Sequence, residues 1–258
     1  MNLCRIFIFH LNPKLNSWLI ENLKYNILLY KMVIIMNTII ILAGGKGTRF
    51  NAPIEKQYNE VSNGKSILEM TLERIKSYKL FDEYVIVTRL NWLQWTNDLV
   101  KRLKIKRFNI VVSGNTRNES MINGMQVANG EKIVVHDAVR PLTPKEVFEE
   151  VLEKLDKYDV VTTVRNITGN LARIGNNQII DVLDRNKYVI GEAPTGYNKD
   201  VVEKILEEYD RNHSIVELPH DIQIPLKLGY NVGYIVYNGF NLKITYKSDL
   251  ETLRKLIE

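Results

Sequence analysis

The chain has 258 residues, 45% of them hydrophobic and 25% charged, which is enough for one good-sized folded core and excludes global disorder. Its net charge of +5 is modest and no nucleic-acid-binding pattern is present, so we expect no nucleic-acid partner. A single cysteine, Cys4, excludes a disulfide framework and a cysteine-based zinc site, and four scattered histidines offer no metal-ligand spacing. This composition favours a protein of the reducing cytoplasm.

Residues 1–35 differ from the rest of the chain. Their short apolar pieces never approach the ~20 residues that cross a bilayer, and they lack a signal-peptide pattern. They hold much of the excess positive charge, in Arg5, Lys14, Lys24 and Lys31 against Glu21. We interpret them as an extension ahead of a domain at 36–258, with Met32 or Met36 as a later translation start. A segment that contacts a membrane surface is the alternative, although we expect no membrane partner.

The most informative segment begins with the apolar run Thr38–Ala43, which predicts a buried parallel strand. A glycine-rich turn follows at once, and glycines let backbone N–H groups approach an anion closely. The turn and its surroundings supply Gly44, Gly45, Gly47 and the cations Lys46, Arg49 and Lys56. A nucleoside triphosphate needs this combination, although a basic turn without function is the structural alternative.

Two common phosphate-binding motifs do not fit this turn. A P-loop needs Gly-Lys followed by Ser or Thr, whereas Lys46 lies between two glycines. A dinucleotide fingerprint needs a third glycine where Phe50 stands. The turn therefore indicates another class of nucleotide-binding protein.

From Thr38 onward the chain alternates between strand and helix patterns. Further strands are predicted at 83–88, 108–112 and 132–136, and helices at 67–77, 90–103 and 116–128. Thr143 is a good N-cap for the next helix, with Pro144 at its first position. This alternation predicts a Rossmann-like, doubly wound α/β fold with a mostly parallel sheet.

The pattern changes after residue 159. A strand at 159–165 leads into segments 171–174 and 178–182, which predict a β-hairpin around Gly175-Asn176-Asn177. Because it is inserted between strands of a sheet, we expect this hairpin to leave the sheet as an arm at about residues 164–190. The remaining elements are expected to be a strand near 188–192, helices at 198–209 and near 221–228, strands at 232–236 and 242–245, and a helix from 248.

Sheets of this type bind ligands at the carboxyl ends of their strands. The glycine turn follows the first strand, Ser113–Ser120 the third and His136–Pro141 the fourth. Each segment alone has a structural explanation, Asp137 as a turn residue and Arg117 as a solvated helix charge. Three such segments at three strand ends favour a shared anion-binding site.

Five motifs together resemble those of the cytidylyltransferases that act on polyol phosphates, the ribitol-5-phosphate and 2-C-methyl-D-erythritol 4-phosphate enzymes. They are Leu42–Arg49, Lys56-Gln57-Tyr58, Gly114 with Arg117 and Ser120, His136–Pro141, and Asn241–Thr245. The resemblance covers residues 37–257 and implies a nucleotidyltransferase fold and a homodimer. It also implies a reaction in which CTP and a polyol phosphate give a CDP-polyol and pyrophosphate, with Mg²⁺.

The resemblance also implies residue roles. Arg49, Lys56 and Lys243 would be catalytic, positioning two anions and stabilising charge, since a phosphate monoester needs no base to act as a nucleophile. The nucleotide would bind Ala43, Gly44, Gly45, Gly47, Gly114, Arg117, Ser120, Asp137, Ala138 and Arg140. The acceptor would bind Asp137, Thr168, Lys243 and, from a partner subunit's arm, Arg185. Mg²⁺ would be held mainly by the CTP phosphates, with Asp137 as the candidate protein ligand.

The chain departs from the family pattern mostly in the acceptor half. Glu55 stands where the family usually has Pro, and the family's Asp-Thr, Thr-Pro-Gln and Thr-Asp become Asn166-Ile167, Ala193-Pro194-Thr195 and Pro219-His220-Asp221. We therefore expect CTP as donor and favour ribitol 5-phosphate as acceptor, because Arg117–Ser120, His136–Arg140 and Asn91–Trp95 look nearer that branch. Trp92 and Trp95 are expected to pack in the core or on the arm.

Three other functions stay open at this point. The acceptor could be 2-C-methyl-D-erythritol 4-phosphate, for isoprenoid synthesis rather than a cell-wall or capsule precursor. The chain could be a nucleotide-binding homologue without catalysis, although retention of Arg49, Lys56 and Lys243 argues against it. It could also be a nucleotidyltransferase that uses another nucleoside triphosphate or a sugar 1-phosphate. The motif Asn241-Leu242-Lys243 near the end of the chain favours the polyol-phosphate branch instead.

Overall fold

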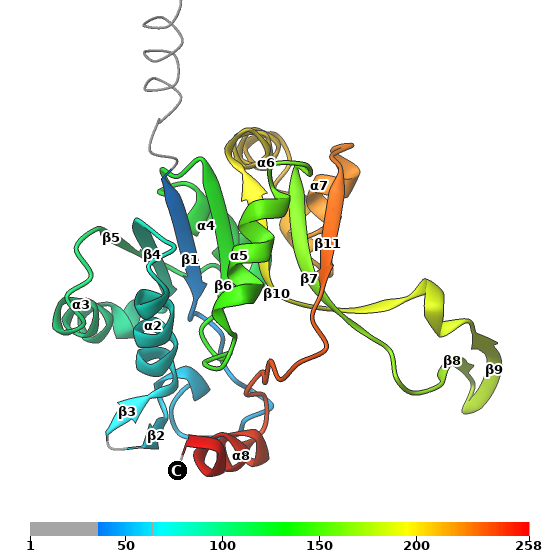
Figure 1. Cartoon of the computed structure of the whole chain (residues 1–258), viewed down its shortest axis with the longest axis horizontal. Coiled ribbons are helices and arrows are strands. Elements are labelled where there is room, and N and C mark those ends of the chain that lie inside the picture. The colour runs from blue at the N-terminus through cyan, green and yellow to red at the C-terminus, as the bar shows by residue number, and fades with distance from the viewer. Residues whose placement is uncertain (1–35, 63, 258) are drawn as a thin grey trace, which may run out of the picture. The chain divides into compact units, whose positions relative to one another are not determined.

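The computed structural model describes residues 36–62 and 64–257, so the prediction for residues 1–35 lies outside the described part of the chain. At the centre is a seven-stranded sheet in the order β11-β7-β10-β6-β1-β4-β5 (Figure 1). All its strands run parallel except β10, which is antiparallel to β6 and β7. The strands are β1 (Asn37–Leu42), β4 (Glu83–Thr88), β5 (Phe108–Val112), β6 (Lys132–Asp137), β7 (Val160–Asn166), β10 (Val189–Asn198) and β11 (Val232–Val236).

Helices cover both faces of this sheet, as the alternating pattern predicted. Successive side chains of a strand point to opposite faces, so Ile39 and Ile41 pack in one core and Ile40 packs in the other. The first core contains residues of α2 (Ile67–Tyr78), α3 (Leu93–Arg102) and α5 (Lys145–Lys154). The second contains residues of α4 (Arg117–Met125), α6 (Lys199–Arg211) and α7 (Gln223–Lys227). The expected doubly wound α/β fold is thereby confirmed.

A third, smaller core holds the C-terminal helix beside the glycine turn. Phe50, which follows the turn, is buried with Ile244 and with Leu250 and Leu253 of α8 (Lys247–Ile257). Val61 of the short ribbon formed by β2 (Glu60–Ser62) and β3 (Lys65–Ser66) joins them. The helix α8 is thus packed against the segment that follows the glycine turn. Within residues 36–62 and 64–257, no helix has both the length and the apolar character needed to cross a bilayer.

Two local predictions were wrong. Residues 242–245 form no strand, because the backbone of Ile244 bonds instead to the Val139 carbonyl and the Lys56 ammonium group. The helix α5 starts at Lys145 with Pro144 as its N-cap residue. The Thr143 hydroxyl, predicted to cap this helix, donates to Oδ1 of Asn241 instead.

The predicted arm is present between β7 and β10, and Figure 1 shows it leaving the sheet. Its ribbon consists of β8 (Leu171–Gly175) and β9 (Gln178–Leu183). Asn176 and Asn177 form the turn with φ of 48° and 59°, the left-handed pair that a type I′ hairpin requires. Side chains of the ribbon are largely exposed, with 77% exposure for Ile174, 70% for Ile179 and 68% for Val182. A two-stranded ribbon buries too little apolar surface to be stable without further packing.

Candidate active site

A cleft of about 620 Å³ lies at the carboxyl ends of β1, β4, β5 and β6. This is where a sheet of this topology is expected to bind ligands. Ten of the predicted site residues line it together, namely Gly44, Gly45, Gly47, Arg49, Lys56, Gly114, Arg117, Ser120, Asp137 and Lys243. Residues far apart in the sequence therefore meet in one cavity, as the strand-end argument predicted.

The glycine turn is held in a narrow space between the first and third strand ends. A side chain at Gly44 would place its Cβ 2.1 Å from Cβ of Ser113, so the backbone can pass here only as glycine. Gly47 has a φ of +66° and lies against Lys56. The Gln57 amide nitrogen donates to the Gly45 carbonyl at 3.0 Å, which ties the turn to the short helix η1 (Lys56–Tyr58).

Substituting the two adjacent glycines by alanine compares a crowded position, Gly44, with an open one, Gly45. Gly44→Ala is expected to lower the free energy of unfolding by roughly 1–3 kcal/mol, because the methyl group overlaps Ser113. Gly45→Ala is the matched control, since nothing lies within 4 Å of its added methyl group. Urea denaturation of both variants measures the difference. Equal stabilities would contradict the packing described for Gly44.

The second side of the cleft is the amino end of α4. Thr116 caps the helix by accepting from the Glu119 N–H at 3.0 Å, and Glu119 accepts from the Asn115 N–H at 2.6 Å. Ser120 Oγ accepts from the Gly114 N–H at 3.1 Å and donates to the Thr116 carbonyl at 2.9 Å. A helix amino end carries partial positive charge, and this one opens into the cleft. The arrangement suits an anionic or hydrogen-bonding part of a nucleotide.

Asp137 lies at the centre of a cluster of positive charge. Its carboxylate is 2.8 Å from Nζ of Lys243, 3.4 Å from Nε of Arg140 and 3.5 Å from an Nη atom of Arg117. Burial alone would raise the pKa of Asp137, but Arg117, Lys243 and Arg140 hold that pKa well below its usual range. Asp137 is therefore ionised at every physiological pH and holds Lys243 in the cleft.

Lys56 comes to the same place from the opposite side. Its Nζ donates to the Ile244 carbonyl at 2.7 Å, so it is bonded to the residue that follows Lys243. Burial, together with the charge of Lys243, lowers the pKa of Lys56 to about 8. A lysine with such a pKa is still charged at neutral pH. Because the surrounding protein does not fully stabilise that charge, an anionic ligand in the cleft would bind to it favourably.

Glu55, which replaces the family's usual Pro, has a structural place next to Lys56. Its carboxylate accepts from Nε1 of Trp92 at 2.8 Å and lies 3.1 Å from Nε of Arg89. The Trp92 ring in turn stacks on Tyr58 with 3.9 Å between ring centroids. Trp92 and Trp95 pack against the first core, as one of the two expectations for them proposed, and not on the arm.

Five predicted site residues do not line this cleft. Ala43 and Ala138 are buried beneath it, and Arg140 is buried behind Asp137 with its side chain 7% exposed. Thr168 and Arg185 lie exposed on the arm, where Nη1 of Arg185 donates to the Thr168 carbonyl at 2.7 Å.

One cleft-lining cation, Arg89, was missed by the sequence analysis. It follows β4 directly, so the strand-end rule applied to the other three strands would have found it. His136 lies next to Asp137 but takes no part in the cleft. Burial lowers the pKa of His136 to about 4, and its ring packs against Phe148.

A glycine turn, a helix amino end and a group of cations around one carboxylate define a nucleotide-binding α/β protein. The family model of IspD, 2-C-methyl-D-erythritol 4-phosphate cytidylyltransferase, matches residues 37–257. The chain therefore belongs to the 2-C-methyl-D-erythritol 4-phosphate cytidylyltransferase family of nucleotidyltransferases.

Curated relatives of this chain carry two acceptor names. A ribitol-5-phosphate cytidylyltransferase of Lactiplantibacillus plantarum is 28% identical over 84% of this chain and 97% of its own length. A 2-C-methyl-D-erythritol 4-phosphate cytidylyltransferase of Thermotoga neapolitana is 30% identical over 85% of this chain and 96% of its own length. The bifunctional ribulose 5-phosphate reductase/CDP-ribitol pyrophosphorylase Bcs1 of Haemophilus influenzae is 30% identical over 85% of this chain, which spans 48% of that protein.

Solved structures agree on the fold. The 4-diphosphocytidyl-2C-methyl-D-erythritol synthase of Anaerococcus prevotii superposes with a TM-score of 0.72 at 22% identity, over 86% of this chain and 98% of that one. The 2-C-methyl-D-erythritol 4-phosphate cytidylyltransferase of Francisella tularensis gives 0.70 at 23% identity, over 84% and 97%. The predicted nucleotidyltransferase fold is thereby confirmed.

Proposed function

We propose that this protein transfers the cytidylyl group of CTP to a polyol phosphate, with ribitol 5-phosphate as the favoured acceptor, and releases pyrophosphate. The observation that carries the proposal is the convergence of Lys56, Lys243 and Asp137 on the glycine turn in one cleft. The names of the Lactiplantibacillus and Haemophilus relatives support ribitol, and the Thermotoga relative supports 2-C-methyl-D-erythritol 4-phosphate as the second candidate.

The proposed chemistry is an in-line displacement at the α-phosphate of CTP. An oxygen of the acceptor phosphate forms the new P–O bond while the bond from the α-phosphate to the bridging oxygen breaks and pyrophosphate leaves. The phosphate monoester is already a nucleophile, so the protein must position two anions and stabilise negative charge. Lys56, Lys243 and Arg49 all line the cleft and are the cations assigned to this task.

Mg²⁺ is the proposed cofactor, and the cleft suits one that arrives with the nucleotide. Among the described residues that line the cleft, Asp137 is the one carboxylate, and no group of three His, Cys, Asp or Glu gathers anywhere in 36–62 and 64–257. Mg²⁺ is commonly bound through one or two carboxylates plus substrate phosphates and keeps several waters. When bound, the ion would neutralise charge on the triphosphate, with Asp137 as its protein ligand.

The arm is proposed to complete the site of a second subunit in a homodimer. Thr168 and Arg185 lie on the arm and do not line the cleft of their own chain. The exposed Ile174, Ile179 and Val182 would be covered in such a dimer, which supplies the packing that an isolated ribbon lacks.

A donor and acceptor screen tests the proposed function. The full-length protein is incubated with Mg²⁺, each of the four nucleoside triphosphates and either ribitol 5-phosphate or 2-C-methyl-D-erythritol 4-phosphate, and pyrophosphate release is measured. Release is expected with CTP and one of these acceptors, in amounts equal to the CDP-polyol formed. Binding of CTP without release for any acceptor would favour the non-catalytic homologue instead.

The affinity for CTP is expected to fall as pH rises above about 8. The free protein carries a charged Lys56 below its pKa of about 8 and a neutral one above it, so an anion loses one attraction as pH increases. Calorimetry from pH 6.5 to 9.5 should show a constant Kd for CTP up to about pH 8. Above that pH the Kd should rise by up to about tenfold per pH unit, until the pH reaches the pKa of Lys56 in the CTP complex. The Lys56→Met variant is the control, and an equal bend in its profile would assign the dependence to another group.

A further inference from the structure

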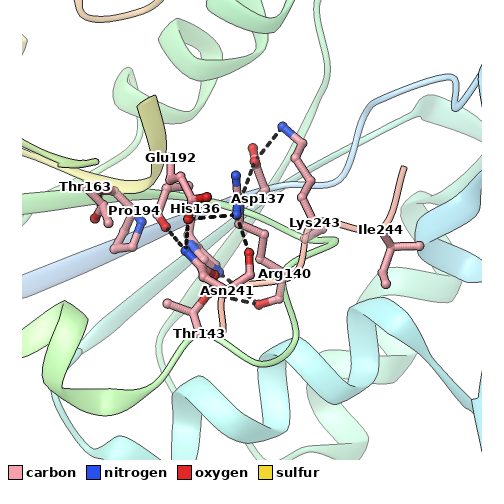
Figure 2. Close-up of polar contacts among 12 residues, drawn as sticks. His136, Asp137, Arg140, Thr143, Thr163, Glu192, Pro194, Asn241, Lys243 and Ile244 are labelled. Carbon is pink, nitrogen blue, oxygen red and sulfur yellow. Dashed lines mark hydrogen bonds and ion pairs between the residues drawn. The ribbon is translucent and has the colours of Figure 1, made fainter. Parts of the chain in front are cut away.

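A buried polar cluster behind Asp137 has no direct part in the proposed reaction. It consists of Arg140, Thr143, Glu192 and Asn241, which Figure 2 shows gathered to the left of Lys243. The side chains of Arg140 and Glu192 are 7% and 9% exposed, and Asn241 is 8% exposed. Removing charged groups from water costs free energy that pairing only partly offsets, so a buried cluster of this kind suggests a role beyond stability.

The contacts of the cluster converge on Asn241. Nη1 of Arg140 donates to the Asn241 carbonyl at 2.6 Å, and the Thr143 hydroxyl donates to Oδ1 of Asn241 at 2.7 Å. Nδ2 of Asn241 donates to Oε2 of Glu192 and to the Ala193 carbonyl, both at 2.9 Å. Both ends of the Asn241 amide and its carbonyl group are therefore held.

Asn241 lies two residues before Lys243 in a segment that has no sheet ladder to position it. Residues 241–245 are irregular, and further anchors lie beyond Lys243: the Ile244 N–H bonds to Val139, the Ile244 carbonyl to Lys56 and the Thr245 N–H to Asp249. The Lys243 ammonium group reaches Asp137 at 2.8 Å from this segment. The backbone of Lys243 is thus held from Asn241 on one side and from Ile244 and Thr245 on the other, and the hold on Asn241 contributes to its position in the cleft.

Glu192 joins this arrangement to the root of the arm. It lies in β10 between Gly191 and Thr195, where the register with β7 shifts, and such a bulge re-aims a side chain. Its carboxylate is 3.4 Å from Nη1 of Arg140 and 3.3 Å from Nε of Arg165, a residue of β7 at the other side of the root. One carboxylate therefore contacts the arm's root, the arginine behind Asp137 and the residue that anchors the Lys243 segment.

We propose that Glu192 is a positioning residue for Lys243, acting through Arg140 and Asn241, and that it connects the root of the arm to the reaction centre. This inference rests on the proposed catalytic role of Lys243. Loss of the Glu192 charge leaves Arg140 less well held and weakens one of the bonds to Asn241, so the Lys243 ammonium group is less often in its place beside Asp137.

A double-mutant cycle tests the inference, with kcat measured by pyrophosphate release from CTP and the acceptor that is turned over in the screen. Glu192→Gln is expected to lower kcat about tenfold, the scale of a lost hydrogen bond to a charged group, and to leave the Kd for CTP within about twofold. In a Lys243→Ala background the same substitution is expected to lower the residual rate no further, because coupled residues are not additive. Glu131→Gln, which removes an exposed ion pair with Lys199, is the control.

A second pair of variants tests the same inference if Glu192→Gln does not fold. Thr143→Val removes the hydroxyl that holds Asn241 without changing any charge, and Thr143→Ser retains it. We expect a several-fold loss of kcat in the first, none in the second, and no effect of either in the Lys243→Ala background. Full additivity, or wild-type kcat in both Glu192→Gln and Thr143→Val, would overturn the positioning role alone. Normal turnover by Lys243→Ala would overturn the proposed role of Lys243 and this inference together.

Discussion

Replacing Lys243 by alanine is expected to lower kcat by about a hundredfold or more, because a cation that stabilises developing charge is lost. The side chain is 38% exposed and pairs with Asp137 at 2.8 Å, so its removal opens no cavity in a core. Asp137 keeps Arg117 and Arg140 as partners, which limits the loss of stability. The measurements are kcat and KM for CTP and the acceptor, with the midpoint of thermal unfolding taken in parallel.

Lys56→Ala is expected to cause a loss of similar size, since it removes a second cation from the same cleft and a bond to the segment that carries Lys243. Nζ of Lys56 contacts the Ile244 carbonyl, one residue beyond Lys243. Lys199→Ala is the control, because Lys199 pairs with Glu131 on the surface away from the cleft. Normal turnover by the Lys243 variant would show that its role is wrongly assigned.

Mixing two inactive variants is expected to restore activity if the arm serves a neighbouring subunit. Lys56→Ala disables the cleft of its own chain, whereas Arg185→Ala disables the arm that the neighbour would use. In a mixed dimer one cleft then has both an intact Lys56 and an intact partner arm. Random exchange gives about half mixed dimers with one working site each, so roughly a quarter of the wild-type rate should appear where neither parent has any.

Subunit exchange must be shown in the same experiment. Two differently tagged variants are mixed, the doubly tagged species is isolated, and its rate of pyrophosphate release is compared with that of each parent. Light scattering gives the mass of the wild-type protein. A monomer, or an inactive doubly tagged dimer, would defeat the shared-site proposal.

Local patterns predicted most of the sheet. Three strands, at 83–88, 108–112 and 232–236, have the predicted bounds, because short runs rich in Val and Ile favour extended backbone. The strand-end rule then brought the glycine turn, Arg117 and Asp137 together, since parallel strands deliver their following loops to one edge.

The same reasoning was wrong where long-range contacts replace a local preference. Leu242–Thr245 alternates like a strand, but the backbone N–H and carbonyl of Ile244 bond to Val139 and Lys56, which lie elsewhere in the chain. Thr143 has the sequence context of a helix cap, yet its hydroxyl bonds to Asn241, which lies 98 positions away.

The sequence by itself determined the α/β class, the arm, and the set of glycines and cations that a nucleotide needs, because these depend on short-range periodicity and on residue chemistry. Only the tertiary structure decided which of those residues face the cleft. It placed Arg140 behind Asp137, added Arg89, and bonded Lys56 to the segment that carries Lys243. Those relations depend on where irregular segments are held by buried side chains, and a buried contact between residues that are distant in sequence leaves no periodic signal in either one.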